Sequence, residues 1–404
     1  MTITEKIKDK KTVHIISIFF MLCYFISYVT RINYGAIIAE MESARHISKS
    51  LLSLALSGSA VTYAAGQIIS GYLGDKFQPK RLIFIGLLTT VATNIAVPFA
   101  ESITLTIAIW CINGFAQAFM WPPLVKMMTS MFTMEDYTKA CIIVSCGASV
   151  GTIAVYLISP LIISVSGWKE VFWVSAAAAA VFSAVWLKFC PNVKISHQQK
   201  RSLDNGSGRK FITPLMILIM IAIILQGSLR DGVTTWMPSL ISETYNMSST
   251  IAILSGVVLP IFSMLSYTLT ELLYKKVIKN IMVCSGAIYV MSAAAGVLLL
   301  ASSGKSAVLS IISCMLITGC MHGVNLLLIS FTPPFFAKSG KAAFASGLLN
   351  SCTYIGSSIS VYGFAKITEN TSWNTTLWLW LAISVLGVIL CFASSGLWKR
   401  DMMN

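Results

Sequence analysis

The sequence predicts an all-α polytopic membrane protein with twelve transmembrane helices, arranged as two six-helix bundles. Of its 404 residues, 56% are hydrophobic and only 11% are charged, and the mean hydropathy is +0.78. Soluble proteins average about 25% charged residues, so this chain needs the lipid bilayer as its solvent. A bilayer core about 30 Å thick takes roughly 20 apolar residues per helix, and the chain length then allows about twelve spans.

Apolar runs separated by charged or turn-rich breaks define these spans in order. A polar stretch follows the sixth span, and we interpret residues 191–210 as a cytoplasmic linker. It divides the chain into an N-terminal six-helix bundle, residues 1–190, and a C-terminal six-helix bundle, residues 211–404. The predicted spans are 13–41, 51–73, 82–100, 104–127, 140–165, 170–189, 212–240, 250–273, 281–301, 307–331, 343–366 and 375–396.

The basic residues predict the orientation. With a cytoplasmic N-terminus, about 22 of the 29 basic residues lie on the cytoplasmic side, as the positive-inside rule requires. We therefore expect a multi-pass protein of the inner (cytoplasmic) cell membrane, in contact with lipid and with both termini cytoplasmic. The net charge of +14 comes from short segments between apolar runs. Because no basic domain interleaved with aromatic residues appears, we expect no nucleic-acid partner.

Cysteine spacing and the few acidic residues argue against an enzyme. The ten cysteines are scattered, and no CxxC pair or Cys/His spacing typical of a metal site occurs. The sequence also lacks a nucleophile–base constellation and a glycine loop that binds phosphate. We expect no metal, no cofactor and no catalytic residue.

Two arginines lie far inside apolar runs. Arg31 follows Val13 by 18 positions in the first span, and Arg230 follows Ile212 by 18 positions in the seventh. At 1.5 Å per residue this is about 27 Å along each helix. A charge at that depth costs roughly 3 kcal/mol on insertion scales, so such residues are usually functional. Equal depth in corresponding helices predicts that the two arginines form one anion site between the bundles. The alternative is that one arginine snorkels or pairs with a buried acid.

The loop after the second span runs from Gly71 to Arg81 and contains Asp75, Lys76 and Lys80. It resembles the loop signature of the major facilitator superfamily. The resemblance implies that the glycine lets helices approach closely and that the aspartate pairs with basic residues in a gating role. The alternative is an ordinary charged turn.

Three further stretches are distinctive: Arg31-Ile32-Asn33-Tyr34, Leu229-Arg230-Asp231-Gly232 and the fourth-span run Trp110-Cys111-Ile112-Asn113-Gly114-Phe115-Ala116-Gln117-Ala118-Phe119-Met120-Trp121-Pro122-Pro123. Together they resemble the organophosphate:phosphate antiporter family, which includes the glycerol-3-phosphate and hexose-phosphate transporters. The resemblance implies the major facilitator fold, with Arg31 and Arg230 holding the phosphate. A guanidinium suits this role because it stays protonated and its planar fork matches phosphate oxygens.

The other candidate substrate-binding residues are polar or aromatic groups in or near these spans. Ordinary packing is the alternative for the tyrosines, and helix–helix hydrogen bonds are the alternative for Asn33 and Asn325. His322 is a ligand donor, a titrating group or a core histidine, and Asp231 and His322 are candidates for proton coupling. The full set is Tyr28, Asn33, Tyr34, Tyr63, Gln67, Gln117, Trp121, His322, Asn325 and Tyr354.

These features together predict a secondary active transporter of a small organic anion that functions as a monomer. The leading hypothesis is exchange of an organic phosphate ester for inorganic phosphate by rocker-switch alternating access. Two unpaired arginines in the empty carrier would make closing without an anion costly, which favours obligate exchange. The alternatives are a proton-coupled symporter of a carboxylate or sugar acid, and a transporter-like membrane sensor of organophosphates.

Overall fold

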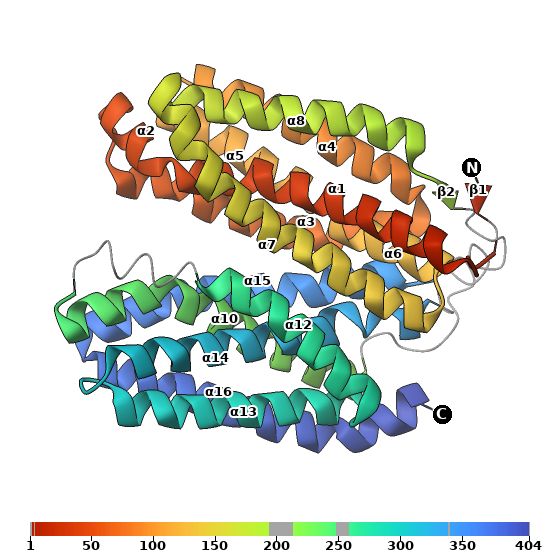
Figure 1. Cartoon of the computed structure of the whole chain (residues 1–404), viewed down its shortest axis with the longest axis vertical. Helices are drawn as coiled ribbons and strands as arrows, with labels where there is room; N and C mark the ends of the chain where they lie inside the picture. Colours follow the sequence, from red (N-terminus) through yellow and green to blue (C-terminus); the bar gives the residue numbers. More distant parts are fainter. Residues whose placement is uncertain (1, 4, 194–212, 248–257, 338–339, 404) are drawn as a thin grey trace. The chain divides into compact units, whose positions relative to one another are not determined.

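A computed structural model describes residues 2–3, 5–193, 213–247, 258–337 and 340–403 (Figure 1). The chain divides into two units, of which unit 1 is Met1–Ser207 with Pro333–Ser351 and unit 2 is Gly208–Thr332 with Cys352–Asn404. Unit 1 thus includes residues 333–351, which the sequence places in the second bundle. Most of the predicted linker lies outside the described residues.

Several helices of unit 1 begin at small polar caps or at prolines. Ser48, Ser102 and Thr133 each accept a hydrogen bond from a backbone N–H of the first turn that would otherwise lack a partner. Helix α1 packs along α7, and α3 packs along α5 (Figure 1). The elements are β1 (Thr2–Ile3), α1 (Lys10–Ala36), α2 (Ile38–Arg45), α3 (Lys49–Lys76), α4 (Pro79–Ala96), η1 (Val97–Phe99), α5 (Ile103–Gln117), α6 (Trp121–Met131), α7 (Met134–Val165), α8 (Trp168–Phe189), β2 (Asn192–Val193) and η3 (Pro333–Phe336).

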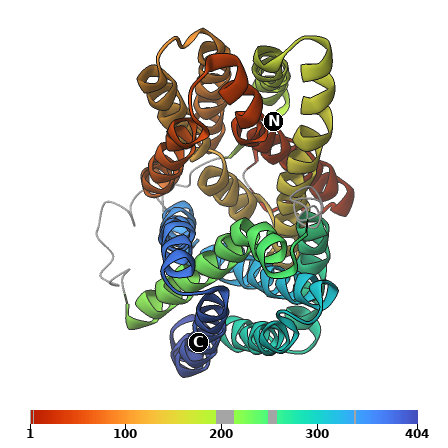
Figure 2. The ribbon, with the colours of Figure 1, turned by 90° about the vertical axis from the view of Figure 1, so that its left-hand side faces the viewer.

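Unit 2 follows the same principle, with Thr213, Asn280 and Ser306 capping its helices. Helices α13 and α16 lie side by side in both views of the molecule (Figure 1 and Figure 2). The first part of α15 belongs to unit 1 and the remainder to unit 2. The elements are α10 (Pro214–Tyr245), α12 (Val258–Lys276), α13 (Ile281–Ser302), α14 (Ala307–Asn325), η2 (Leu326–Ser330), α15 (Ala342–Asn370), α16 (Trp373–Trp398) and η4 (Lys399–Met403).

The helices confirm the expectation of an all-α polytopic membrane protein. Ten helices or helix pairs within the described residues are long and apolar enough to cross a bilayer. The eighth and eleventh predicted spans correspond to α12 and α15, although residues 250–257 of the eighth lie outside the described part. Two strands of two residues each, β1 and β2, pair in parallel, with Thr2 opposite Asn192. They are too short to alter the fold class.

Several predicted spans are interrupted where the sequence suggests continuous helix. The fourth span breaks between α5 and α6, where Pro122 and Pro123 occupy the first turn of α6. Proline has no backbone N–H and fits the first turn of a helix better than its interior. The first span ends at Ala36, before the short α2, and the tenth continues past Asn325 as a π-helical turn.

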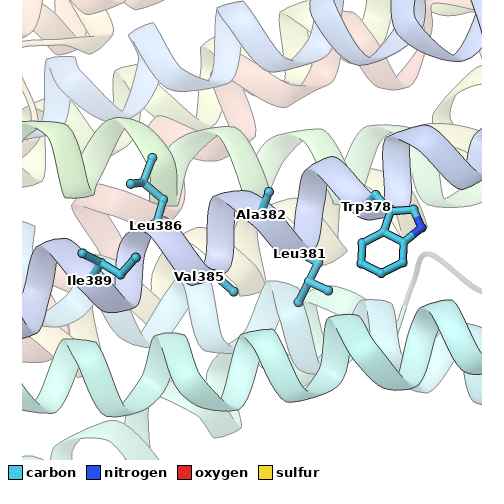
Figure 3. A pocket seen from close by; sticks show the side chains of 6 residues that line it. All are labelled: Trp378, Leu381, Ala382, Val385, Leu386 and Ile389. Carbon is cyan, nitrogen blue, oxygen red and sulfur yellow. The ribbon is translucent and has the colours of Figure 1, made fainter.

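An exposed apolar face runs along α16. A shallow groove along it is lined by side chains spaced three or four residues apart, which therefore share one face of the helix (Figure 3). Trp378 is 57% exposed and Ile389 is 58% exposed. An exposed stripe of this kind faces acyl chains in a membrane protein. The lining residues are Trp378, Leu381, Ala382, Val385, Leu386 and Ile389.

Within unit 2, α10 and α15 approach each other closely through two glycines. A Cβ at Gly227 would overlap with the carbonyl oxygen of Thr353, and one at Gly356 would overlap with that of Ile224. The Ser228 hydroxyl donates to the Gly356 carbonyl oxygen at 3.0 Å across the same crossing. Small residues allow such backbone contact between membrane helices. The crossing sets the register between the turn that carries Arg230 and the turn after Gly356.

We predict that Gly227→Ala lowers the free energy of unfolding by about 1–3 kcal/mol, because the added methyl group forces the two helices apart. The matched control is Gly396→Ala on α16, where an added Cβ meets nothing within 4 Å. Replacing glycine by alanine at an open helix position raises the free energy of unfolding by up to about 1 kcal/mol. Denaturant unfolding in detergent, followed by circular dichroism, measures both. Equal stability of the two variants would contradict the close crossing.

Candidate functional site

Arg31 lies on α1, partly exposed, and two tyrosine rings flank its guanidinium. The Cζ atom is 4.3 Å from the ring centroid of Tyr28 and 4.9 Å from that of Tyr63. Tyr28 is one turn away on the same helix, and Tyr63 comes from α3. An aromatic face stabilises a cation electrostatically and is worth about 0.5–2 kcal/mol, more when water is excluded. In unit 1, the arginine inside the first apolar span therefore lies against aromatic rings.

The aromatic surroundings of Arg31 extend to a residue that the sequence analysis did not identify. The Tyr24 ring lies 5.2 Å from that of Tyr28 and 5.2 Å from that of Trp121. Trp121 begins α6 directly after the helix break, so the break places its indole among these rings. The sequence could have indicated Tyr24 through its spacing, because Tyr24 and Tyr28 are four residues apart and share a helix face.

Asn33 and Gln117 belong to a buried polar network in unit 1. Asn33 Nδ2 donates to Asn94 Oδ1 at 2.8 Å, and Gln117 Nε2 donates to Thr30 Oγ1 at 3.0 Å. Gln117 Oε1 also accepts from the Ser27 hydroxyl at 2.5 Å. Asn33 and Gln117 are both fully buried. For Asn33 this arrangement favours the alternative in which its amide joins helices rather than binds substrate. Gln117 also joins helices through its hydrogen bonds.

Tyr34 and Gln67 are likewise fully buried. The Tyr34 hydroxyl donates to the Leu52 carbonyl oxygen at 3.2 Å, and its ring lies 4.8 Å from that of Trp110. Gln67 Oε1 accepts from Asn350 Nδ2 at 3.0 Å within unit 1. Both side chains therefore pack between helices.

Arg230 has a different environment, because it forms an ion pair with the next residue on α10. Its Nε donates to Asp231 Oδ1 at 2.6 Å, and its Nη2 donates to Asp231 Oδ2 at 2.9 Å. The arginine side chain is 15% exposed and the aspartate side chain 27% exposed. Asp231 thus binds the guanidinium of the residue directly before it. Adjacent helical residues diverge by about 100° and do not normally face each other.

Three further helices of unit 2 contribute to the surroundings of this pair. The Ser357 hydroxyl of α15 is a hydrogen-bonding partner of Asp231, and His322 of α14 is near enough to interact electrostatically with both charges. Tyr267 of α12 holds His322 through its hydroxyl, 3.1 Å from Nδ1. Ser357 follows Gly356, so the close crossing of α10 and α15 brings it to Asp231.

The remaining predicted residues of unit 2 lie near this group in sequence. Asn325 ends α14, one turn after His322, and is partly exposed. Tyr354 is partly exposed on α15, one turn before Ser357. Their positions keep both as candidates for the same site.

Asp75 of the loop motif is buried at the start of α15. Its carboxylate accepts from the backbone N–H groups of Ala343 and Phe344 at 3.1 and 2.8 Å. It also pairs with Lys126 of α6 at 3.3 Å, and both side chains are at most 3% exposed. A carboxylate at a helix N-terminus is stabilised by the helix dipole. A Cβ at Gly71 would lie 2.6 Å from the Ala343 carbonyl oxygen, so this approach needs glycine.

The other basic residues of the motif have partners outside it or are exposed. Lys80 donates to the Cys190 carbonyl oxygen at 2.7 Å, and Lys76 lies over the Tyr72 ring. Arg81 is exposed. The basic partner of Asp75 is therefore Lys126, which the sequence analysis did not identify. The sequence marks Lys126 as the single charge in the otherwise uncharged run from Trp121 to Met131.

Within the described ranges, no group of three His, Cys, Asp or Glu side chains is placed to hold a metal ion.

The model of one protein family matches residues 20–361, most of the chain, and its description is the Major Facilitator Superfamily. The chain belongs to this superfamily. A solved structure of the proton:xylose symporter XylE has the same fold, with a TM-score of 0.76 over 94% of this chain and 95% of that one, at 11% identity. The fold is therefore an all-α, multi-pass membrane fold of this superfamily.

Two relatives within the superfamily act on anions according to their names. A probable sulfoacetate transporter of Cupriavidus necator is 24% identical over 89% of this chain and 88% of its own length. A probable hexose phosphate transport protein of Chlamydia pneumoniae is 26% identical over 42% of this chain and 38% of its own length. The relatives are transporters rather than enzymes, and they handle anions or sugar-related compounds.

We predict that Asp75→Asn destabilises the protein by about 3 kcal/mol, because it leaves the buried Lys126 ammonium without its counter-charge. The matched control is Glu135→Gln, which removes an exposed partner of Lys139, 61% and 54% exposed respectively. That change should cost less than about 0.5 kcal/mol. Thermal unfolding in detergent measures both.

The double variant Asp75→Asn/Lys126→Met should recover part of the loss, because it removes both buried charges together. A double variant less stable than Asp75→Asn would contradict this assignment.

Proposed function

We propose that this protein is a secondary active transporter of a small organic anion, with Arg31 and Arg230 binding the anionic group. The observation that carries the proposal is the geometry at Arg230, whose Nε and Nη2 bind both oxygens of a carboxylate. Two parallel N–H···O bonds of this kind recognise carboxylates and phosphates specifically. A side chain in this geometry, in the middle of an apolar helix, is suited to binding an anion there.

The proposed substrate is an organic phosphate ester exchanged for inorganic phosphate by rocker-switch alternating access. The relatives' names support the anion class, since sulfoacetate and hexose phosphates both carry a tetrahedral oxyanion group. A guanidinium fork binds two oxygens of such a group as it binds a carboxylate. The tyrosines around Arg31 add an aromatic surface with hydroxyl groups, which suits the organic part of the substrate.

Proton-coupled symport of a carboxylate or sugar acid is the second candidate, and the Arg230–Asp231 pair favours it. The argument from sequence for obligate exchange requires two arginines without counter-charges in the empty carrier. Arg230 has a carboxylate partner in this structure. Closing without substrate therefore costs less than two unpaired charges would imply, and a titratable group lies at the site.

The setting of this function is proposed from the sequence. Lysine and arginine distribution supports a cell-membrane location with both termini cytoplasmic. We propose a functional monomer whose other partners are lipid and inorganic phosphate.

We predict that anions of the correct class stabilise the purified protein in detergent, since a ligand that binds the folded state raises its stability with concentration over Kd. The panel is inorganic phosphate, glucose 6-phosphate, sulfoacetate and gluconate, with uncharged glucose as the negative control. Stabilisation by at least one anion and none by glucose is the expected result. Equal stabilisation by glucose would contradict an anion site.

The same screen tests the two arginines. Arg31→Lys and Arg230→Lys keep the charge but lose the planar fork, so each should weaken binding by at least about tenfold. Arg400→Lys, at an exposed pair with Asp401 near the C-terminus, is the matched control and should bind as the wild type does. Unchanged affinity in both test variants would show that the anion binds elsewhere.

Vesicles distinguish exchange from symport. For the exchanger, uptake of labelled substrate requires phosphate inside the vesicle and leaves the internal pH unchanged. For the symporter, uptake proceeds into phosphate-free vesicles and acidifies the lumen, as a trapped pH-sensitive dye reports. Uptake that needs internal phosphate would reject symport, and acidification without internal phosphate would reject exchange.

A further inference from the structure

The Arg230–Asp231 pair has a consequence for how substrate binds. The carboxylate oxygens of Asp231 occupy Nε and Nη2, which are the donors of one edge of the guanidinium. A substrate oxyanion that approaches this edge needs the same two donors. The two anionic groups therefore compete for one pair of N–H bonds.

Other groups in unit 2 hold Asp231 in this competing position. Ser357 is its hydrogen-bonding partner on α15, and the Gly227 and Gly356 crossing fixes the distance between α10 and α15. The aspartate side chain is still 27% exposed, so it has room to leave the guanidinium. Asp231 is therefore held at Arg230 but is accessible enough for a substrate anion to displace it.

We propose that Asp231 is a resident ligand of Arg230, which the transported anion displaces, and that the displaced carboxylate takes up one proton. This inference rests on the proposed function, in which Arg230 binds the substrate. The carboxylate loses its two bonds to Arg230, a proton from solvent adds to one of its oxygens, and the anion forms two bonds to the vacated donors. Release of the anion reverses these steps and returns the proton to solvent.

Charge balance in a low-dielectric setting favours proton uptake. In the empty state, the charges of Arg31, Arg230 and Asp231 sum to one positive charge. If a dianion such as sulfoacetate binds to both arginines while Asp231 stays ionised, the cluster carries one negative charge inside the membrane. Burying an uncompensated charge costs several kcal/mol. Protonation of Asp231 restores neutrality, so anion and proton bind together.

The titratable and charged groups around Asp231 come from the helices packed against α10. Arg230 precedes it on α10, His322 faces it from α14, and Tyr267 of α12 holds His322. On α15, Tyr354 lies one turn before Ser357. Helix α16 also packs against α10 and has no Asp, Glu, Lys, Arg or His from Trp373 to Trp398. Asp231 is thus the carboxylate of this group, and His322 is the other candidate proton acceptor.

The test measures binding of sulfoacetate and of glucose 6-phosphate to the full-length protein by titration calorimetry between pH 6 and 8. Sulfoacetate is the cleaner probe, because its sulfonate and carboxylate remain ionised over this range, whereas a phosphate ester titrates near pH 6. Buffers of different ionisation enthalpy report the protons taken up. One proton per anion is expected, with Kd rising about tenfold per pH unit.

The variant Asp231→Asn removes the competitor and the titrating group together. It should bind sulfoacetate more tightly than the wild type at pH 8, with an affinity that no longer depends on pH and no proton uptake. The matched control is Glu243→Gln, an acidic residue on the same helix whose carboxylate accepts from Trp373 Nε1. It should keep the pH dependence of the wild type.

His322→Gln separates the two possible proton acceptors and should also retain the pH dependence. If His322→Gln abolishes proton uptake while Asp231→Asn preserves it, the assignment to Asp231 is wrong. The calorimetry of the wild type stands without any variant, and zero protons taken up would overturn the inference even if Asp231→Asn did not fold.

The outcomes also separate this inference from the proposed function. Loss of binding in Arg230→Lys, with no proton uptake by the wild type, would reject the role of Asp231 and keep the anion site. Full binding in Arg230→Lys, or no binding of either probe to the wild type at any pH, would reject the proposed site itself.

Discussion

The cost of placing charge inside a lipid bilayer governs the arrangement of this protein. Each charged side chain in its apolar helices has to recover the lost hydration from a specific neighbour. Three solutions occur in the described residues. Asp75 and Lys126 pair with each other at a helix N-terminus, Arg31 lies against tyrosine rings, and Arg230 binds Asp231. The first pair is almost fully buried and stabilises the fold, whereas both arginines retain some exposure.

In the proposed binding mode, a substrate therefore meets a different obstacle at each arginine. A cation–π contact uses the face of the guanidinium, whereas an oxyanion binds to N–H groups in its plane. Tyr28 and Tyr63 can accordingly stay in place when an anion binds to Arg31. Asp231 uses two in-plane donors of Arg230, on Nε and Nη2, so in the proposed binding mode the substrate has to displace it. The two arginines thus lie at equal depth in the two halves of the sequence but have different neighbours, aromatic rings at Arg31 and a carboxylate at Arg230.

Sequence alone predicted the fold class and the approximate positions of the membrane helices, because these depend on hydrophobic content. The cost of isolated charges also drew attention to the two arginines, whose role as an anion site stays a prediction. It did not predict the helix break before Trp121, since an apolar run shows no difference between a continuous and an interrupted helix. The networks that bury Asn33 and Gln117 depend on partners from other helices. The pairing of Asp231 with Arg230 depends on side-chain rotamers, which helical spacing does not specify.

The resident carboxylate also limits how tightly Arg230 can hold any substrate. Replacing one chelating oxyanion by another conserves two N–H···O bonds and one ion pair, so the net gain at Arg230 is only the difference between two similar interactions. Selectivity must then come from groups that make contacts only with the substrate. In the proposed binding mode, the candidates in unit 1 are Arg31 and the rings of Tyr24, Tyr28, Tyr63 and Trp121. A carrier benefits from such weak binding, because an anion held too tightly at its centre would not be released on the other side.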